Sequence, residues 1–212
     1  MNDTKLRILD AAERLFAQQG FDVSIRAITD EAGVNLAAVN YHFQSKEALL
    51  DAIIARRIEP VNKRRLEMLD AIEARTGDRP LPLEAVLEAF LAPVLEAPFE
   101  HFKPLIGRMY SVPEEFIKRV FHVHLAPIVV RFDAAFARAL PDLPESERIW
   151  RLYFSIGAMV HVMNWSRVLR PISNGVLDPS DTRALMRRMV AFAAAGFRAP
   201  VVENQPVHRG TN

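Results

Sequence analysis

Apolar residues recur at steps of three and four along almost the whole 212-residue chain, which is the spacing of an amphipathic helix. No segment of useful length alternates between apolar and polar residues, so the pattern predicts no strands. The sequence therefore predicts an all-α protein of about nine helices. The main predicted helices cover residues 4–19, 25–32, 36–42, 46–73, 83–96, 114–139, 145–169 and 181–197, with one or two short pieces between 97 and 113.

Helix-ending and helix-capping residues divide the first fifty positions into short elements. Gly20 and Gly33 stand where a helix C-terminus favours a left-handed residue, and Ser24, Asn35 and Ser45 stand where a side-chain oxygen can cap the next helix. Three helices this small bury little surface alone, so we expect them to dock on the helices that follow.

Two prolines and the change in helix length indicate how the chain is organised. Pro60 lies inside the fourth predicted helix, where it should produce a kink, and Pro127 should bend a later one. The fourth helix is expected to link two domains. We predict a helix-turn-helix domain at 1–50, a ligand-binding and dimerisation domain at 51–200, and a disordered tail at 201–212.

The third predicted helix has the layout of the recognition helix in a helix-turn-helix. On a helical wheel, Val39 and Phe43 share one side, and Ala37 and Tyr41 fall on the opposite side. Small outward side chains let the helix axis approach base edges, Asn40 can pair with adenine, and polar groups at the helix ends can reach phosphates. The expected DNA contacts are Ser24, Arg26, Leu36, Ala37, Ala38, Asn40, Tyr41, His42 and Lys46. Taken singly, the histidine, the asparagine and the lysine also fit plain surface positions; their joint spacing indicates DNA binding.

The same motifs closely resemble the DNA-binding module of the tetracycline-repressor (TetR) family over residues 5–52. The resemblance implies a homodimer that represses transcription and releases DNA when a small molecule enters its second domain. Asn40 stands where the family often has an aromatic residue, so its base contacts need not be those of the family. The matching residues are Ala11-Ala12, Leu15-Phe16, Gly20-Phe21, Ser24, Ile28, Ala32-Gly33-Val34, Tyr41-His42-Phe43 and Ser45-Lys46-Glu47-Ala48-Leu49.

Charge and composition limit the kinds of site and the cellular location that the sequence allows. The net charge is +1, and residues 1–57 hold seven basic and eight acidic side chains, so phosphate binding depends on where the charges stand. The chain has no cysteine, which excludes disulfides and cysteine-based zinc or catalytic sites. No signal peptide and no uninterrupted apolar run of roughly 18 residues is visible. We expect a soluble, cytoplasmic protein with no membrane partner.

The second predicted domain carries no catalytic motif, so we do not interpret the chain as an enzyme. His122 and His124 are two residues apart and fall on different faces of a helix, so neither a metal nor a cofactor is expected. Large apolar residues are frequent instead, and some of them could line a pocket between helices. The candidate ligand-binding residues are His101, Phe102, Lys103, Arg108, Met109, Phe121, Tyr153 and His161, although the polar ones also fit solvated positions.

The last two predicted helices form a candidate dimer face, because apolar residues recur along them and small residues at 193–196 allow close approach. Burial against their own domain alone is the other interpretation. The candidate interface residues are Ile149, Ile156, Met163, Leu185, Met189 and Phe192.

We therefore interpret the sequence as a TetR-type regulator, a repressor that binds a palindromic operator as a dimer and is released by a small apolar ligand. Residues 149–158 and 37–41 are similar to a TetR subgroup that senses long-chain fatty acids or their CoA esters, which implies an acyl ligand. Two alternatives stay open: a DNA-binding regulator controlled by a protein partner, and a helical enzyme whose N-terminal module is only structural.

Overall fold

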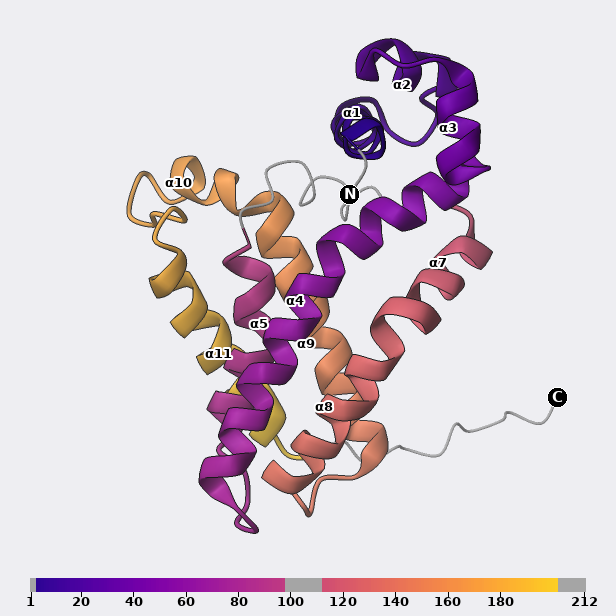
Figure 1. Cartoon of the computed structure of the whole chain (residues 1–212). Coiled ribbons are helices and arrows are strands. Elements are labelled where there is room, and N and C mark those ends of the chain that lie inside the picture. Colours follow the sequence, from indigo (N-terminus) through magenta and orange to yellow (C-terminus); the bar gives the residue numbers. More distant parts are fainter. Residues whose placement is uncertain (1–2, 98–111, 202–212) are drawn as a thin grey trace, which may run out of the picture.

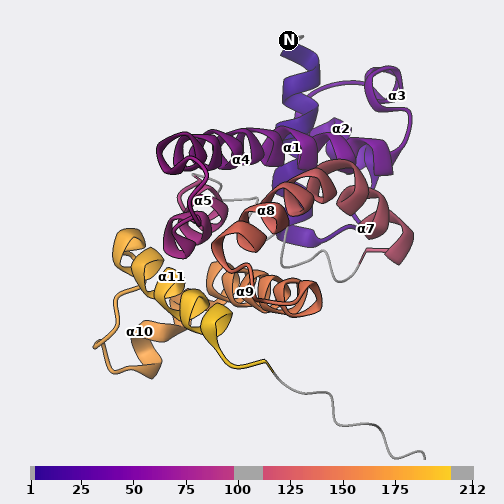
Figure 2. The same ribbon diagram turned by 90° about the horizontal axis from the view of Figure 1, so that it is seen from below.

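The computed structural model describes residues 3–97 and 112–201, and every regular element within these ranges is a helix, which confirms the all-α prediction. The helices are α1 (Asp3–Gln19), α2 (Ile25–Ala32), α3 (Leu36–Phe43), α4 (Lys46–Thr76), α5 (Leu83–Leu95), α7 (Glu114–Val120), α8 (Ala126–Ala139), α9 (Glu145–Trp165), α10 (Leu169–Ile172) and α11 (Thr182–Arg198). Figure 1 shows α1, α2 and α3 gathered at one end, with α4 running from them along the longer helices. In Figure 2, α9 and α11 lie on the side away from α1 and α4.

Two separate clusters of buried apolar side chains hold these helices together. The first core joins α1, α2, α3 and the start of α4, and it includes Phe116 and Val120 from α7. The second core lies among α4, α5, α8, α9 and α11 and contains most of the buried phenylalanines. Because α7 belongs to the later part of the chain, the first core extends across the domain boundary predicted at residue 50.

A buried carboxylate also fastens α1 to α4. Glu13 is 2% exposed and accepts hydrogen bonds from Arg56 at 2.6 Å and Arg57 at 2.7 Å. Asp10 pairs with Arg56 at 2.7 Å. Burial acts to lower the pKa of Arg56, but its bonds to the two carboxylates outweigh burial and raise that pKa. These charge pairs fix the position of α1 along α4. α1, α2, α3 and the first turns of α4 correspond to the helix-turn-helix that the sequence predicts to bind DNA, and they are called the DNA-binding module below.

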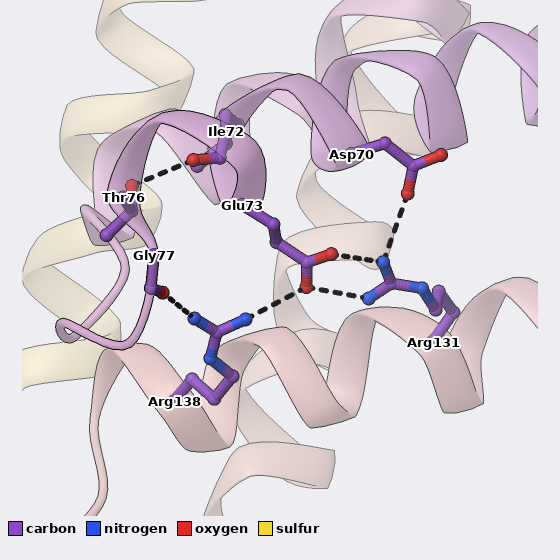
Figure 3. Close-up of polar contacts among 7 residues, drawn as sticks. All are labelled: Asp70, Ile72, Glu73, Thr76, Gly77, Arg131 and Arg138. Atoms are coloured by element: carbon purple, nitrogen blue, oxygen red, sulfur yellow. Dashed lines mark hydrogen bonds and ion pairs between the residues drawn. The ribbon is translucent and has the colours of Figure 1, made fainter.

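α4 is one helix of 31 residues that continues through Pro60. In Figure 1 it changes direction along its length, in keeping with an internal proline. Ion pairs join its last turns to α8 (Figure 3), where Glu73 contacts both Arg131 and Arg138, and Asp70 lies 3.1 Å from Arg131. The C-terminal half of α4 is thereby fixed to α8, while its N-terminal end belongs to the DNA-binding module.

α7 and α8 are joined by a single π-helical turn, Phe121–Leu125, in which the Ala126 N–H donates to the Phe121 carbonyl. Pro127 stands directly after this turn, at the start of α8. In a regular helix its ring would clash with the carbonyl four residues earlier, and its missing N–H would leave that carbonyl without a donor. The bend predicted at Pro127 therefore takes the form of a π turn just before it.

Within the described ranges, the one helical stretch with the length and composition of a membrane span is Glu114–Ala139. A third of its most apolar window is buried, and Ile128, Phe132 and Phe136 pack in the second core. A core helix passes the same test, and packing in the second core accounts for the apolar residues that are buried here.

The helix predicted over 145–169 is shorter in the structure. α9 ends at Trp165, and a 3-10 turn, Ser166–Val168, leads into the short α10. Pro171 removes one helical hydrogen bond in this region, which favours short, tight turns over a continued helix. The boundaries of α3 and α4 differ from prediction only at their C-terminal ends.

Candidate nucleic-acid interface

α2 and α3 form a helix-turn-helix with the caps that the sequence predicts. Ser24 Oγ accepts a hydrogen bond from the Ala27 N–H at 3.1 Å, and Asn35 Oδ1 accepts one from the Ala38 N–H at 2.9 Å. Between them Gly33 has a left-handed φ of 63°, and its N–H donates to carbonyls in the last turn of α2. The turn is therefore hydrogen-bonded at both helix ends, which sets the angle at which α3 leaves α2.

α3 is anchored by Val39 and Phe43, which are 2% and 4% exposed in the first core. Its opposite side faces outward: Leu36 is 54% exposed, Tyr41 is 81% exposed, and Ala37 is exposed beside them. The orientation predicted from the helical wheel is confirmed. A short helix with an uncovered outer side is what major-groove insertion requires.

The other predicted contacts differ in how much surface they offer. Ala38 is half-buried against the first core, so it has less surface available to a base than its neighbours. His42 is also half-buried, and its ring lies edge-on to that of Tyr41 with centroids 5.0 Å apart. Lys46 places Nζ 6.0 Å from the centroid of the Phe16 ring. The predicted contacts that are exposed are Ser24, Arg26, Leu36, Ala37, Asn40 and Tyr41.

Arg7 on α1 holds the turn between α2 and α3, a role that the sequence did not reveal. Its Nη2 donates to the carbonyls of Ala32 at 2.6 Å and Gly33 at 2.7 Å. Carbonyls at a helix C-terminus lack partners within the helix, and a positive charge there suits the helix dipole. A Cβ at position 33 would lie 2.8 Å from the same Nη2. Arg7 is therefore a positioning residue for α3.

Gln44, between α3 and α4, is a second residue that the sequence analysis did not single out. Its φ is 60°, which a residue with a Cβ rarely adopts, and its N–H donates to the Asn40 carbonyl at 3.2 Å. Ser45 then caps α4 by accepting from the Ala48 N–H at 3.0 Å. The chain thus turns sharply between the end of α3 and the start of α4.

Aromatic side chains are exposed on one side of α9. The Trp150 and Phe154 rings are stacked with centroids 5.5 Å apart, and Tyr153 lies edge-on to Trp150 at 6.1 Å. These three side chains are 56–66% exposed, as is Ile149 at 56%, and Phe192 on the neighbouring α11 is 67% exposed. We call these five residues the aromatic face. Exposed apolar clusters of this kind mark binding surfaces.

The structure corrects the predicted dimer residues in one respect. Met189 is 6% exposed within the second core, because α11 turns Met186, Met189 and Ala193 toward α5 and α9. Its side chain is therefore not available to a partner. Ile149 and Phe192 are exposed, and the half-buried members of the predicted set are Ile156, Met163 and Leu185.

The predicted ligand-binding residues are not brought together within the described ranges. Phe121 and Tyr153 are 42% and 66% exposed, and His161 is exposed as well. Side chains on outer helix surfaces do not line an enclosed site, so Tyr153 belongs to the aromatic face instead. The inward and outward sides of α9 are both apolar, so the spacing of apolar residues in the sequence does not show which side is buried. The remaining candidates lie outside the described residues: His101, Phe102, Lys103, Arg108 and Met109.

Family models match two parts of the chain. Residues 8–53 match the model described as bacterial regulatory proteins, tetR family, and residues 88–196 match the one described as tetracyclin repressor-like, C-terminal domain. The chain is 32% identical over 114 residues to the HTH-type transcriptional regulatory protein RaaS of Mycobacterium tuberculosis, covering 52% of this chain and 54% of RaaS. It is 37% identical over 70 residues to the HTH-type transcriptional regulator UidR of Escherichia coli, covering 32% of this chain and 36% of UidR. The matches thus span about half the length of these relatives or less.

Solved structures resemble the fold over nearly the whole chain. Salmonella enterica GusR has a TM-score of 0.61 at 19% identity, covering 92% of this chain and 96% of GusR. A bacterial regulatory protein in the tetR family from Rhodococcus RHA1 has a TM-score of 0.64 at 19% identity, covering 95% of this chain and 100% of that protein. At such identities the likeness shows the fold alone.

Proposed function

Since the chain belongs to the TetR family of bacterial transcriptional regulators, which are DNA-binding proteins rather than enzymes, we propose that it represses transcription as a homodimer on a palindromic operator. A small apolar ligand bound in the second domain releases the DNA, and the protein acts in the cytoplasm. The observation that carries this proposal is the outward side of α3, opposite the buried Val39 and Phe43, where Leu36, Ala37 and Tyr41 stand free to enter a groove.

Contacts between α7 and the DNA-binding module supply a route for release. Phe116 and Val120 are each 4% exposed and pack in the first core, which also contains Leu50 and Ile54 of α4. A ligand that shifts α7 in the second domain would therefore move side chains that support α3 and α4. Such coupling is typically ~1–3 kcal/mol, and it requires that the ligand bind the DNA-free conformation more tightly.

Dimerisation follows from the need for two reading helices. One short helix discriminates few base pairs, and two must lie about one DNA turn apart, ~34–36 Å, to read a palindrome. The aromatic face on α9 and α11 supports this proposal, because a second copy would cover Trp150, Phe154 and Phe192 in an isologous contact.

The DNA-binding part is tested by selecting bound sequences from random DNA and then measuring affinity by fluorescence anisotropy at several salt concentrations. Asn40→Ala should change the selected sequence, whereas Lys46→Ala should weaken binding to all sequences and reduce the salt slope by about one. Arg64→Ala is the matched control, because Arg64 is 63% exposed and lies about 27 Å along α4 from Lys46. If Asn40→Ala selects the same sequences as the wild type, Asn40 does not read a base. If Lys46→Ala and Arg64→Ala lose DNA affinity equally, Lys46 does not lie in the interface.

The dimer is tested by sedimentation of the full chain and of a Phe154→Asp, Phe192→Asp variant. Two buried charges at the aromatic face should convert the dimer to a monomer and abolish binding to a palindrome while a half-site is still bound weakly. Val130→Asp is the control, since Val130 is 69% exposed on α8 and is not one of the five residues of that face. A dimer that survives the double substitution would place the interface elsewhere, and capture of a different protein by this face would favour regulation by a protein partner.

A further inference from the structure

One buried arginine lies beside the second core without an acidic partner. Arg65 on α4 is 4% exposed and stands between Val61 and Leu69 on the inward side of the helix, where an apolar residue is usual. Its Nε donates to the Phe90 carbonyl at 2.8 Å, and its Nη1 donates to Asn62 Oδ1 at 3.1 Å. The guanidinium carbon lies 4.4 Å from the centroid of the Phe90 ring.

The charge of Arg65 is unbalanced among the residues that the structure describes, where no ion pair reaches it. Burial lowers the pKa of Arg65 to about 10, so the side chain is still protonated at neutral pH. An unpaired buried ion carries a large desolvation penalty, which two neutral hydrogen-bond acceptors offset only in part. The other arginines of low exposure each contact a carboxylate: Arg56 and Arg57 with Glu13, Arg148 with Asp133, and Arg151 with Glu147.

Hydrogen bonds connect Arg65 to the junction with the DNA-binding module. Asn62, whose Oδ1 accepts from Arg65, donates from Nδ2 to the His124 carbonyl at 2.7 Å. His124 lies in the π turn between α7 and α8, and its Nε2 is 3.1 Å from Oδ1 of Asp51 near the start of α4. π turns occur frequently at functional sites. A change in the hydrogen bonds of Arg65 can therefore reach the contact between α7 and α4.

We propose that Arg65 binds the acidic head of the effector and that this effector is an amphiphilic carboxylate, which rests on the ligand-released regulator proposed above. A guanidinium has five N–H donors, and two of them meet acceptors among the described residues, so others can bind both oxygens of a carboxylate. The single negative charge of a carboxylate matches the charge of Arg65, which no described carboxylate neutralises, whereas a phosphate dianion would bring a second, unmatched negative charge. Arg65 borders apolar side chains of the second core, among them Leu69 and Phe90, which an aliphatic body would contact. A carboxylate that draws Nη1 away from Asn62 loosens the link to the π turn.

The test compares dodecanoate, dodecanol and dodecyl phosphate, each below its micelle concentration, with the full chain and its Arg65→Met variant. Binding is measured by calorimetry without DNA, and release by anisotropy with DNA. Dodecanoate should bind the wild type about tenfold or more tightly than dodecanol. Arg65→Met should lose that preference and keep its helical content and DNA affinity, because an apolar side chain replaces an unpaired charge. Arg64→Met, on the exposed side of α4, should behave as the wild type.

Several results would overturn the assignment of Arg65. Retention of the dodecanoate preference by Arg65→Met would do so, as would tighter binding of dodecanol or dodecyl phosphate to the wild type. Joint loss of thermal stability and DNA affinity in Arg65→Met would mark a purely structural arginine. Arg65→Lys keeps the positive charge but lacks the planar guanidinium donors, and it should then restore both properties. Glu100 is the acid of residues 98–111, and a stability coupling between Arg65→Met and Glu100→Gln would show that the chain supplies its own counter-charge. Because calorimetry is done without DNA, a chain that binds dodecanoate but no DNA would refute the repressor and not the Arg65 site.

Discussion

Replacing Gly33 with alanine should destabilise the protein by two separable effects, which a double-substitution cycle with Arg7→Met can resolve. The first effect is local: Gly33 has a φ of 63°, and a residue with a Cβ pays ~1–2 kcal/mol there, partly offset by the lower entropy of alanine in the unfolded chain. The second is the contact with Arg7, whose Nη2 would be 2.8 Å from the new Cβ. Since that group is the end of a flexible side chain, it should move away and give up its bonds to Ala32 and Gly33.

The lost hydrogen bonds involve a charged donor but are partly solvent-exposed, so they should add ~1–2 kcal/mol. Gly33→Ala should therefore lower the free energy of unfolding by ~2–3 kcal/mol in the wild type and by ~1 kcal/mol when Arg7 is already methionine. Urea unfolding of the four proteins, with equal m-values, measures the coupling. DNA affinity measured in parallel should fall in each variant, since both disturb the turn that positions α3. If the losses of unfolding free energy in the two single variants add up to that of the double variant within ~0.5 kcal/mol, the coupling is refuted. Unchanged DNA affinity in Arg7→Met would refute the role of Arg7 in positioning α3.

Further outcomes are expected at the domain junction and at two helix contacts. Phe116→Ala should lower the free energy of unfolding by ~3–5 kcal/mol and weaken DNA binding, whereas Phe121→Ala, at a 42% exposed position, should change neither; unaltered DNA affinity in Phe116→Ala would argue against coupling through α7. Hydrogen bonding to Arg131 holds the pKa of Glu73 below the usual 4.5. The stability that Glu73 contributes is therefore present above pH 4.5 and is lost as the pH falls through the lowered pKa. Urea unfolding at pH 7 and pH 3 should therefore show a difference between wild type and Glu73→Gln that shrinks at the lower pH; an equal difference at both would contradict the ion pair. Ser45→Ala should cost ~1 kcal/mol in the same assay by removing the cap of α4, and no loss would show that the cap is redundant.

The features that depend on near neighbours in the chain could be predicted from the sequence. The caps at Ser24, Asn35 and Ser45, and the inward direction of Val39 and Phe43, follow from residue types and from the 3.6-residue period of one helix. For that reason the helix-turn-helix and the outward side of α3 were predicted at the correct positions.

Contacts between distant segments were decided only by the tertiary structure. The bonds of Arg7 to the end of α2 join residues 25 and 26 positions apart. Phe116 and Val120 enter a core whose other buried residues all come from the first sixty positions. Tyr153 faces outward because other helices cover the opposite side of α9, a choice that two equally apolar sides of that helix leave open. Met189 faces inward because α11 packs that side against α5 and α9. Helical periodicity specifies the angle between side chains on one helix, whereas the side that becomes buried depends on which other helices pack against it.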